Sequence, residues 1–206
     1  DSAPLVSVLM NCFNGEKYLR EAIDSIINQT YKNWELVFWD NQSTDKSKAI
    51  FDSYQDDRLK YYYAPEHTDL GGGRANAFKY LYGDYIAVLD VDDIWLPTKL
   101  KKQLQLFTDP DVGIVISDTL FFNETDERIL YDGEYPPEGD VFRELLTGYF
   151  VSLETLMLRK SVIDKLDYGF DADFSFIADF DLILRSARIS KLAISEEVLA
   201  KWRVHE

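Results

Sequence analysis

Residues 85–97 read YIAVLDVDDIWLP, an apolar run that ends abruptly in three carboxylates, Asp90, Asp92 and Asp93. A short apolar run with a sharp polar end is typical of a buried strand. Pro97 suits the first turn of a helix, which we expect to continue to about Phe107. Crowded carboxylates repel one another and each prefers water. The stretch therefore predicts a strand whose terminal carboxylates need a binding partner.

Strand-like and helix-like segments alternate on both sides of this stretch through the first ~110 residues. This rhythm predicts a parallel sheet with helices on both faces. Three glycines at 71–73 predict a turn into a helix. The expected strands are 5–11, 35–40, 59–64, 85–90 and 112–117, and the expected helices are 16–29, 46–54, 74–81 and 97–107.

The rhythm changes in the second half of the chain. Residues 118–139 are polar and turn-rich, and mixed elements follow. The expected helices are 141–146, 161–166 and 180–187, and the expected strands are 155–159 and 192–194. The sequence thus predicts one α/β domain, in which a smaller mixed half, residues 111–206, elaborates a Rossmann-like half, residues 1–110.

Bulk composition limits the function. The 206 residues carry a net charge of −15, which argues against a nucleic-acid partner and against a broad basic membrane face. One cysteine excludes a disulfide framework within the chain and fits a reducing cytosol. No apolar run reaches the ~20 residues of a membrane span. The chain starts at Asp1 without Met and stops in a strand-like stretch, so we expect a catalytic segment truncated at its C-terminus.

The strand ends predict a common site. Ligands of open parallel sheets lie beyond the carboxyl ends of the strands, where Asn11, Asp40 and Asp90 should converge. In an extended chain Asp90 and Asp92 point the same way. Paired carboxylates are a hard oxygen site that suits Mg²⁺ or Mn²⁺. The alternative is that the acidic residues only cap the following helix.

Three blocks in order carry a family resemblance: VSVLMNCFNGEKYLREAIDSIINQTY, ELVFWDNQSTDKS and GDYIAVLDVDDIWLPTKL. They resemble a family 2 glycosyltransferase of the GT-A fold, an inverting enzyme that uses a nucleotide sugar. ADFDLILRSA and KWRVH resemble later, acceptor-side blocks of the same family. The likeness covers nearly the whole chain, and its ordered set of blocks is more specific than any single block.

The resemblance implies roles around the D-x-D element. Asp92 would hold a divalent metal, Mn²⁺ or Mg²⁺, that bridges the donor diphosphate. Asp90 would lie near the ribose and the sugar. Asp93 would support the site or cap the next helix. Arg203 would sit over the diphosphate and His205 would reach the metal.

The resemblance also implies a nucleoside pocket. Asp40 would read the base, most often the uracil of a UDP-sugar, and Arg74 would lie near the nucleotide. Cys12 and Asn14 would line the pocket, although Cys12 fits a small buried residue equally well. The chain departs from the common pattern at three positions, namely Asn11, Asn41 and Gln42.

For the acceptor side, the resemblance implies that Asp179 is the general base. The family frequently places an acid before it, where this chain has Ala178. We expect Asp181 to be capped or ion-paired and His67 to be an exposed loop residue. Two tryptophans, Trp95 and Trp202, could stack on sugars or belong to the core.

Taken together, these patterns predict an inverting transferase that moves a sugar from a UDP-sugar to a saccharide or lipid-linked hydroxyl, as in surface polysaccharide or lipopolysaccharide synthesis. We expect it in the cytoplasm, with peripheral association at the inner membrane face left open. Two alternatives remain: a sugar nucleotidyltransferase, disfavoured by the single glycine in NCFNGEKY, and a non-catalytic nucleotide-sugar or glycan-binding module. No Q-x-x-R-W element and no G-x-G-x-x-G after the first strand are present, which disfavours a processive synthase and a Rossmann dehydrogenase.

Overall fold

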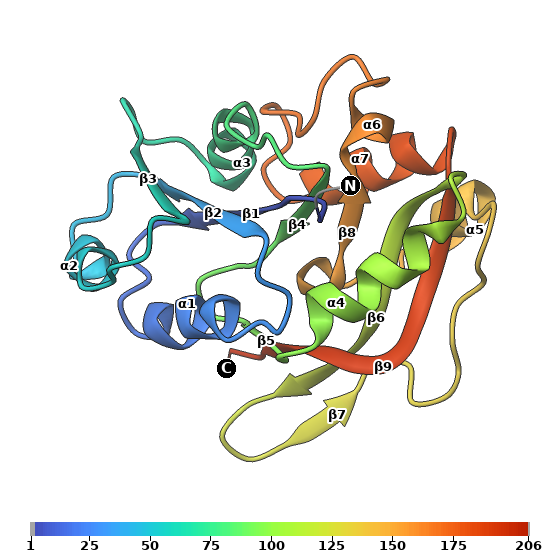
Figure 1. Ribbon diagram of the computed structural model, residues 1–206, viewed down its shortest axis with the longest axis horizontal. Coiled ribbons are helices and arrows are strands. Elements are labelled where there is room, and N and C mark those ends of the chain that lie inside the picture. The colour runs from blue at the N-terminus through green and yellow to red at the C-terminus, as the bar shows by residue number, and fades with distance from the viewer. Residues whose placement is uncertain (1–2, 206) are drawn as a thin grey trace.

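A nine-stranded sheet forms the centre of the computed structural model, which describes residues 3–205 (Figure 1). The strand order is β3-β2-β1-β4-β8-β6-β9-β5, and β7 pairs with β6 outside this path. Helices cover both faces of the sheet. None of the helices within residues 3–205 is long and apolar enough to cross a membrane.

The first half supplies a parallel sheet, as predicted. Strands β3, β2, β1 and β4 pair in parallel, and β1 lies between β2 and β4. The elements are β1 (Val6–Cys12), α1 (Leu19–Ile27), β2 (Trp34–Asp40), α2 (Ser47–Asp52), β3 (Leu59–Tyr63), α3 (Leu70–Phe78) and β4 (Tyr85–Val88).

The second half extends the sheet with mixed pairing. Strand β8 is antiparallel to β4 and to β6, whereas β9 runs parallel to β6. The elements are β5 (Ile94–Trp95), α4 (Lys99–Leu104), the 3-10 turn Gln105–Thr108, β6 (Val112–Phe122), β7 (Glu127–Ile129), α5 (Phe142–Thr147), the 3-10 turn Leu153–Thr155, β8 (Met157–Arg159), α6 (Lys160–Ile163), α7 (Ala178–Ala187) and β9 (Lys191–Arg203).

Two hydrophobic cores lie on opposite faces of the sheet, because side chains alternate along each strand. Leu9 of β1 packs into the core that contains α3, α5 and α7. Its neighbour Met10 packs into the core that contains α1, α2 and α4. The apolar runs of the central strands are buried on both sides, as is usual in parallel sheets.

Strands β6 and β9 are longer than the sequence predicted, and β7 was missed. Strand β9 was expected only at 192–194, yet it continues to Arg203 and pairs with β6 as far as Phe122. The pairing contains irregularities near Asp118, whose buried carboxylate accepts the backbone N–H groups of Thr119 and Tyr131. These internal acceptors replace regular ladder bonds, so the polar sequence does not end the strand.

The predicted glycine turn at 71–73 is wrong, because these glycines form the first turns of α3. Asp69 caps the helix by accepting the N–H of Gly72 at 2.8 Å. A Cβ on Gly71 would lie 1.8 Å from the carbonyl oxygen of Phe174, and one on Gly73 would lie 2.3 Å from Oδ1 of Asn11. Glycine therefore lets β1 and the 171–177 loop approach this helix.

The expectation of an extended chain through Asp90 and Asp92 is also wrong. Strand β4 ends at Val88, and the N–H of Asp93 donates to the carbonyl of Asp90 at 3.2 Å. Residues 90–93 therefore form a turn, and their side-chain directions are set by the neighbours that bind the turn rather than by strand alternation.

Candidate active site

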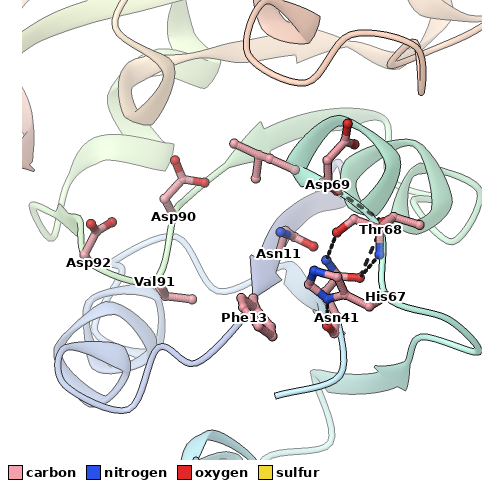
Figure 2. A pocket seen from close by; sticks show the side chains of 10 residues that line it. Asn11, Phe13, Asn41, His67, Thr68, Asp69, Asp90, Val91 and Asp92 are labelled. Carbon is pink, nitrogen blue, oxygen red and sulfur yellow. Dashed lines mark hydrogen bonds between the residues drawn. The ribbon is translucent and has the colours of Figure 1, made fainter. Parts of the chain in front are cut away.

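A pocket of about 400 Å³ opens beyond the carboxyl ends of β1 and β2, where open α/β sheets bind ligands (Figure 2). The turn at 90–93 forms one side, and the segment that leads into α3 forms the other. The lining residues are Asn11, Phe13, Asn41, His67, Thr68, Asp69, Leu70, Asp90, Val91 and Asp92.

One wall of the pocket is held rigid by hydrogen bonds. The side-chain amide of Asn41 donates to the carbonyl of Thr68 at 2.7 Å and accepts its N–H at 3.1 Å. Nδ1 of His67 lies 2.8 Å from the carbonyl oxygen of Asn41, and its ring packs on Phe13 with centroids 4.5 Å apart. His67 is exposed, as expected, but it also lines the pocket. An amide beside two rings suits a flat heteroaromatic ligand.

The opposite side of the pocket carries a partly buried ion pair, in which Arg74 is buried and the side chain of Asp90 is 33% exposed. Arg74 of α3 is 4% exposed and donates to both oxygens of Asp90, at 2.8 and 3.1 Å. Nε of Arg74 and Oδ1 of Asn11 are buried without a hydrogen-bond partner within residues 3–205. The pair neutralises Asp90 and fixes its direction at the edge of the pocket.

Asp92 meets the end of β9. Its Oδ2 lies 2.5 Å from Nε2 of His205, and its backbone oxygen accepts from Nε of Arg203 at 3.0 Å. The side chains of Asp92 and His205 are 29% and 56% exposed, so both can reach a ligand. The structure thus brings together Asp92 and His205, as the family resemblance implied.

Arg203 binds the acidic turn and does not line the pocket. Its N–H donates to Oδ1 of Asp93 at 2.9 Å, and its guanidinium lies 3.8 Å from the ring centre of Tyr18. Asp93 is 2% exposed, and burial together with Asp90 and Glu154 raises the pKa of Asp93 to about 9. Asp93 therefore keeps its proton at neutral pH and adds no charge to the turn.

The metal prediction has partial structural support. Within the described residues, no three His, Cys, Asp or Glu side chains are grouped as a metal site. Asp92 and His205 form a pair, and Oδ1 of Asp92 has no hydrogen-bond partner among residues 3–205. Mg²⁺ is commonly held by one or two carboxylates together with water and substrate phosphate oxygens. The exposed pair fits that mode of binding.

Like Arg74 and Arg203, the predicted donor residues Cys12, Asn14 and Asp40 do not line the pocket. Asp40 is 1% exposed and accepts from the N–H of Ser43 and the hydroxyl of Tyr61. Asn14 accepts the N–H of Thr44 at 2.8 Å. Cys12 is fully buried, and burial raises the pKa of its thiol. All three brace the loop after β2, and their contact with a donor stays a prediction.

Asp179 lies in the first turn of α7, where its Oδ2 accepts from the hydroxyl of Tyr149 at 2.9 Å. Ala178 is buried at 1% exposure, so the position before the predicted base faces the core. Asp181 pairs with Arg185 at 2.7 Å, which confirms the ion-paired interpretation.

The two tryptophans differ in environment. Trp95 is 2% exposed and its indole N–H donates to the carbonyl of Glu154, so it belongs to the core. Trp202 is 41% exposed on β9 and packs edge-on against Phe121. Neither lines the pocket.

Sequence reasoning missed most of the pocket wall. The segment 67–70 follows β3, so the rule that ligands lie beyond strand ends could have indicated it. Phe13 lies inside a quoted block but was given no role. Nothing in the local sequence TGYF indicated that Tyr149 would contact Asp179, which lies 30 residues further along the chain.

The fold and the pocket define a class: an α/β domain whose parallel strands present a nucleotide-sized pocket and an acidic turn. The chain matches the model of glycosyl transferase family 2 over residues 7–167 and belongs to that family. It is 27% identical over 166 residues to the Escherichia coli protein named UDP-Glc:alpha-D-GlcNAc-diphosphoundecaprenol beta-1,3-glucosyltransferase WfgD, covering 81% of this chain and 64% of that protein.

Solved glycosyltransferase structures confirm the predicted GT-A type fold. Residues 1–349 of TarS of S. aureus, in complex with UDP-GlcNAc, align with a TM-score of 0.81 at 18% identity, covering 98% of this chain and 59% of that 1–349 chain. The mannosyltransferase PcManGT of Pyrobaculum calidifontis, in complex with GDP-Man and Mn²⁺, aligns with a TM-score of 0.76 at 19% identity. The alignment covers 98% of this chain and 57% of the PcManGT chain.

The chain spans between 65% and 71% of the length of the curated relatives that match almost all of it. The predicted family and glycosyltransferase class are confirmed by the family match.

Proposed function

We propose that this domain transfers a sugar, with inversion, from a nucleoside diphosphate sugar to a hydroxyl of a saccharide or lipid-linked saccharide. UDP is the proposed nucleotide, in keeping with the donors named for WfgD and TarS. The proposed setting is surface polysaccharide synthesis in the cytoplasm, at the inner face of the membrane. The lipid-linked acceptor in the name of WfgD supports that setting.

Different residues of the pocket would contact the base and the diphosphate of the donor. The base would lie against Phe13 and His67, with the amide of Asn41 as its polar partner. Asn41 lines the pocket whereas Asp40 does not, so Asn41 is the proposed polar neighbour of the base. The ribose and diphosphate would then extend toward Asp90 and Asp92, on the opposite side of the pocket.

Asp92 and His205 would hold Mn²⁺ or Mg²⁺. A divalent cation bound there supplies Lewis-acid stabilisation of the charge that develops on the leaving diphosphate. The Arg74–Asp90 pair holds the neighbouring carboxylate in place, and the protonated Asp93 limits repulsion within the turn.

Asp179 would act as general base. As the acceptor oxygen attacks the anomeric carbon, its proton passes to the carboxylate of Asp179, and the bond to the diphosphate oxygen breaks with its electron pair. Asp179 lies in the first turn of α7, where the hydroxyl of Tyr149 holds one of its two carboxylate oxygens.

The observation that carries the proposal is the Asp92–His205 pair at the edge of a nucleotide-sized pocket. We expect UDP with Mn²⁺ to raise the melting temperature and EDTA to cancel the shift. A ligand at 100 times its Kd stabilises by about 2.7 kcal/mol, and each kcal/mol is worth roughly 2–4 °C at this size. GDP, dTDP and CMP in the same screen identify the base.

Asp92→Ala should abolish the metal-dependent shift, whereas Asp57→Asn, at an exposed carboxylate, should preserve it. An unchanged shift in Asp92→Ala would contradict the proposed metal site.

Asp179→Asn separates catalysis from binding. We expect the variant to keep the nucleotide shift and to lose release of UDP from the sugar donor, because only the base is removed. Wild-type turnover in Asp179→Asn would exclude the general-base role. Nucleotide binding without any turnover in the parent chain would instead favour the non-catalytic binding module.

A further inference from the structure

Tyr149 contacts the proposed base directly. Its hydroxyl donates to Oδ2 of Asp179 at 2.9 Å, across 30 residues of sequence. It lies just after α5, and its ring packs edge-on against Phe180, with centroids 5.1 Å apart and planes at 90°. Phe180 follows Asp179 on α7, so Tyr149 contacts two consecutive residues of the helix.

The contact leaves the carboxylate with one engaged and one free oxygen. Within residues 3–205, Oδ1 of Asp179 has no hydrogen-bond partner, whereas Oδ2 is held by Tyr149. The buried Ala178 supplies no polar group at the position where the family frequently has an acid. Tyr149 is therefore the side chain that orients the carboxylate.

Tyr149 remains a donor over the whole working range of pH. Tyr149 is 40% exposed. Partial burial of its hydroxyl and the neighbouring Asp179 carboxylate raise the pKa of Tyr149, and the charge of Arg74 opposes this in part. A phenol that keeps its proton can donate to a carboxylate but cannot compete with it for the acceptor's proton.

We propose that Tyr149 is a positioning residue for catalysis: its hydroxyl holds Oδ2 of Asp179 so that Oδ1 receives the proton of the acceptor hydroxyl. The inference rests on the proposed function, because it needs Asp179 to be the base. In the step, the acceptor O–H bond breaks and an O–H bond to Oδ1 forms, while Tyr149 keeps its own proton.

The test is Tyr149→Phe, which deletes one oxygen and keeps the ring on Phe180. The readout is UDP release from UDP-glucose and from UDP-GlcNAc with Mn²⁺, with water as acceptor, followed against pH. We expect kcat to fall about tenfold, as for loss of a hydrogen bond to a charged group, with KM for the donor unchanged. The acidic limb of the pH–kcat profile should move to higher pH, because the variant removes a hydrogen bond to the charged carboxylate.

The matched control is Tyr82→Phe, at a tyrosine that is 75% exposed and whose hydroxyl makes no hydrogen bond within the described residues. It should leave kcat, KM and the pH profile unchanged. An unchanged kcat and acidic limb in Tyr149→Phe would overturn the inference. So would a lower activity without any movement of that limb, because a merely structural role predicts this result.

A second measurement needs no turnover. Tyr149→Phe should lower the melting temperature in the parent and have no such effect in an Asp179→Ala background, where the acceptor is gone. Equal shifts in both backgrounds would overturn the contact itself.

Asp179→Asn distinguishes failure of this inference from failure of the proposed function. If Asp179→Asn abolishes turnover and Tyr149→Phe changes nothing, only the positioning role is overturned. If Asp179→Asn keeps wild-type turnover, the base assignment and the role of Tyr149 are overturned together.

Discussion

Gly71→Ala should disrupt the packing of α3 against the 171–177 loop and lower the stability of the protein. The new Cβ would lie 1.8 Å from the carbonyl oxygen of Phe174 and 2.8 Å from its carbonyl carbon. Ordinary contact begins at 3.4 Å, so the loop must retreat by about 1.6 Å. Both obstructing atoms belong to the backbone, so no side-chain rotation can relieve the clash.

The magnitude follows from two opposing effects. Overpacking of this kind costs about 1–3 kcal/mol, whereas alanine gains up to about 1 kcal/mol over glycine within a helix. We therefore expect a net loss of about 1–2 kcal/mol, or roughly 2–8 °C in melting temperature at this size. Urea denaturation gives the free energy of unfolding, and a thermal scan gives the melting temperature.

Gly148→Ala is the matched control, because a Cβ at this position would meet no atom of residues 3–205 within 4 Å. It should change the free energy of unfolding by no more than about 0.5 kcal/mol. A Gly71→Ala variant as stable as the parent would show that the 171–177 loop does not pack on α3 as described.

Two further predictions concern buried polar groups. Lys99 is fully buried, and burial lowers its pKa to about 7, whereas the unfolded chain holds that proton to about pH 10.4. Between these values the unfolded state binds more protons, so stability should rise with pH by up to about 1.4 kcal/mol per unit from this group. Lys99→Met should remove that rise, and parallel curves of unfolding free energy against pH would contradict it. Tyr61→Phe should cost about 1–3 kcal/mol in urea denaturation, because the buried Asp40 carboxylate loses a donor at 2.6 Å; an unchanged stability would show that this bond contributes nothing.

The parallel half of the fold was predictable because most of its strands are apolar runs. Strands β1 to β4 begin within about one residue of their expected starts. Burial on both faces requires such runs in β1, β2 and β4, whereas the edge strand β3 is only partly buried and is indicated by its three tyrosines. Strand β9 was not predictable in full. Its segment KLAISEEVLAKWR contains two adjacent glutamates, Glu196 and Glu197, where pairing with β6 is irregular. Strand β9 extends to Arg203 because it pairs with β6, and its local sequence does not indicate this length.

The glycines of α3 show the same limit. Local propensity argues against a helix at Gly71, Gly72 and Gly73. The helix forms there because Asp69 caps it and because close packing against Asn11 and the 171–177 loop tolerates only glycine. Such contacts join residues distant in sequence, so no local pattern indicates them.

Only part of the candidate site was predictable from the sequence. The ordered motif blocks brought Asp90 and Asp92 to a pocket, and placed His205 beside Asp92. The direction of the Asp40 side chain was missed, because the last residue of a strand can face either side of the sheet. Tyr149 was missed because its contact with Asp179 depends on how α5 and α7 pack.

The distance in sequence between the acidic turn and the end of β9 has a consequence for biosynthesis. The bond from Arg203 to Asp93 closes a separation of 110 residues. At about 5–20 residues per second, the turn would leave the ribosome roughly 5–20 s before the strand that fixes it. During that interval Asp93 lacks the cover that raises its pKa, so it would be an ordinary ionised acid in water. The nascent chain would thus carry an acidic turn that takes its place in the proposed donor site only when β9 is in place.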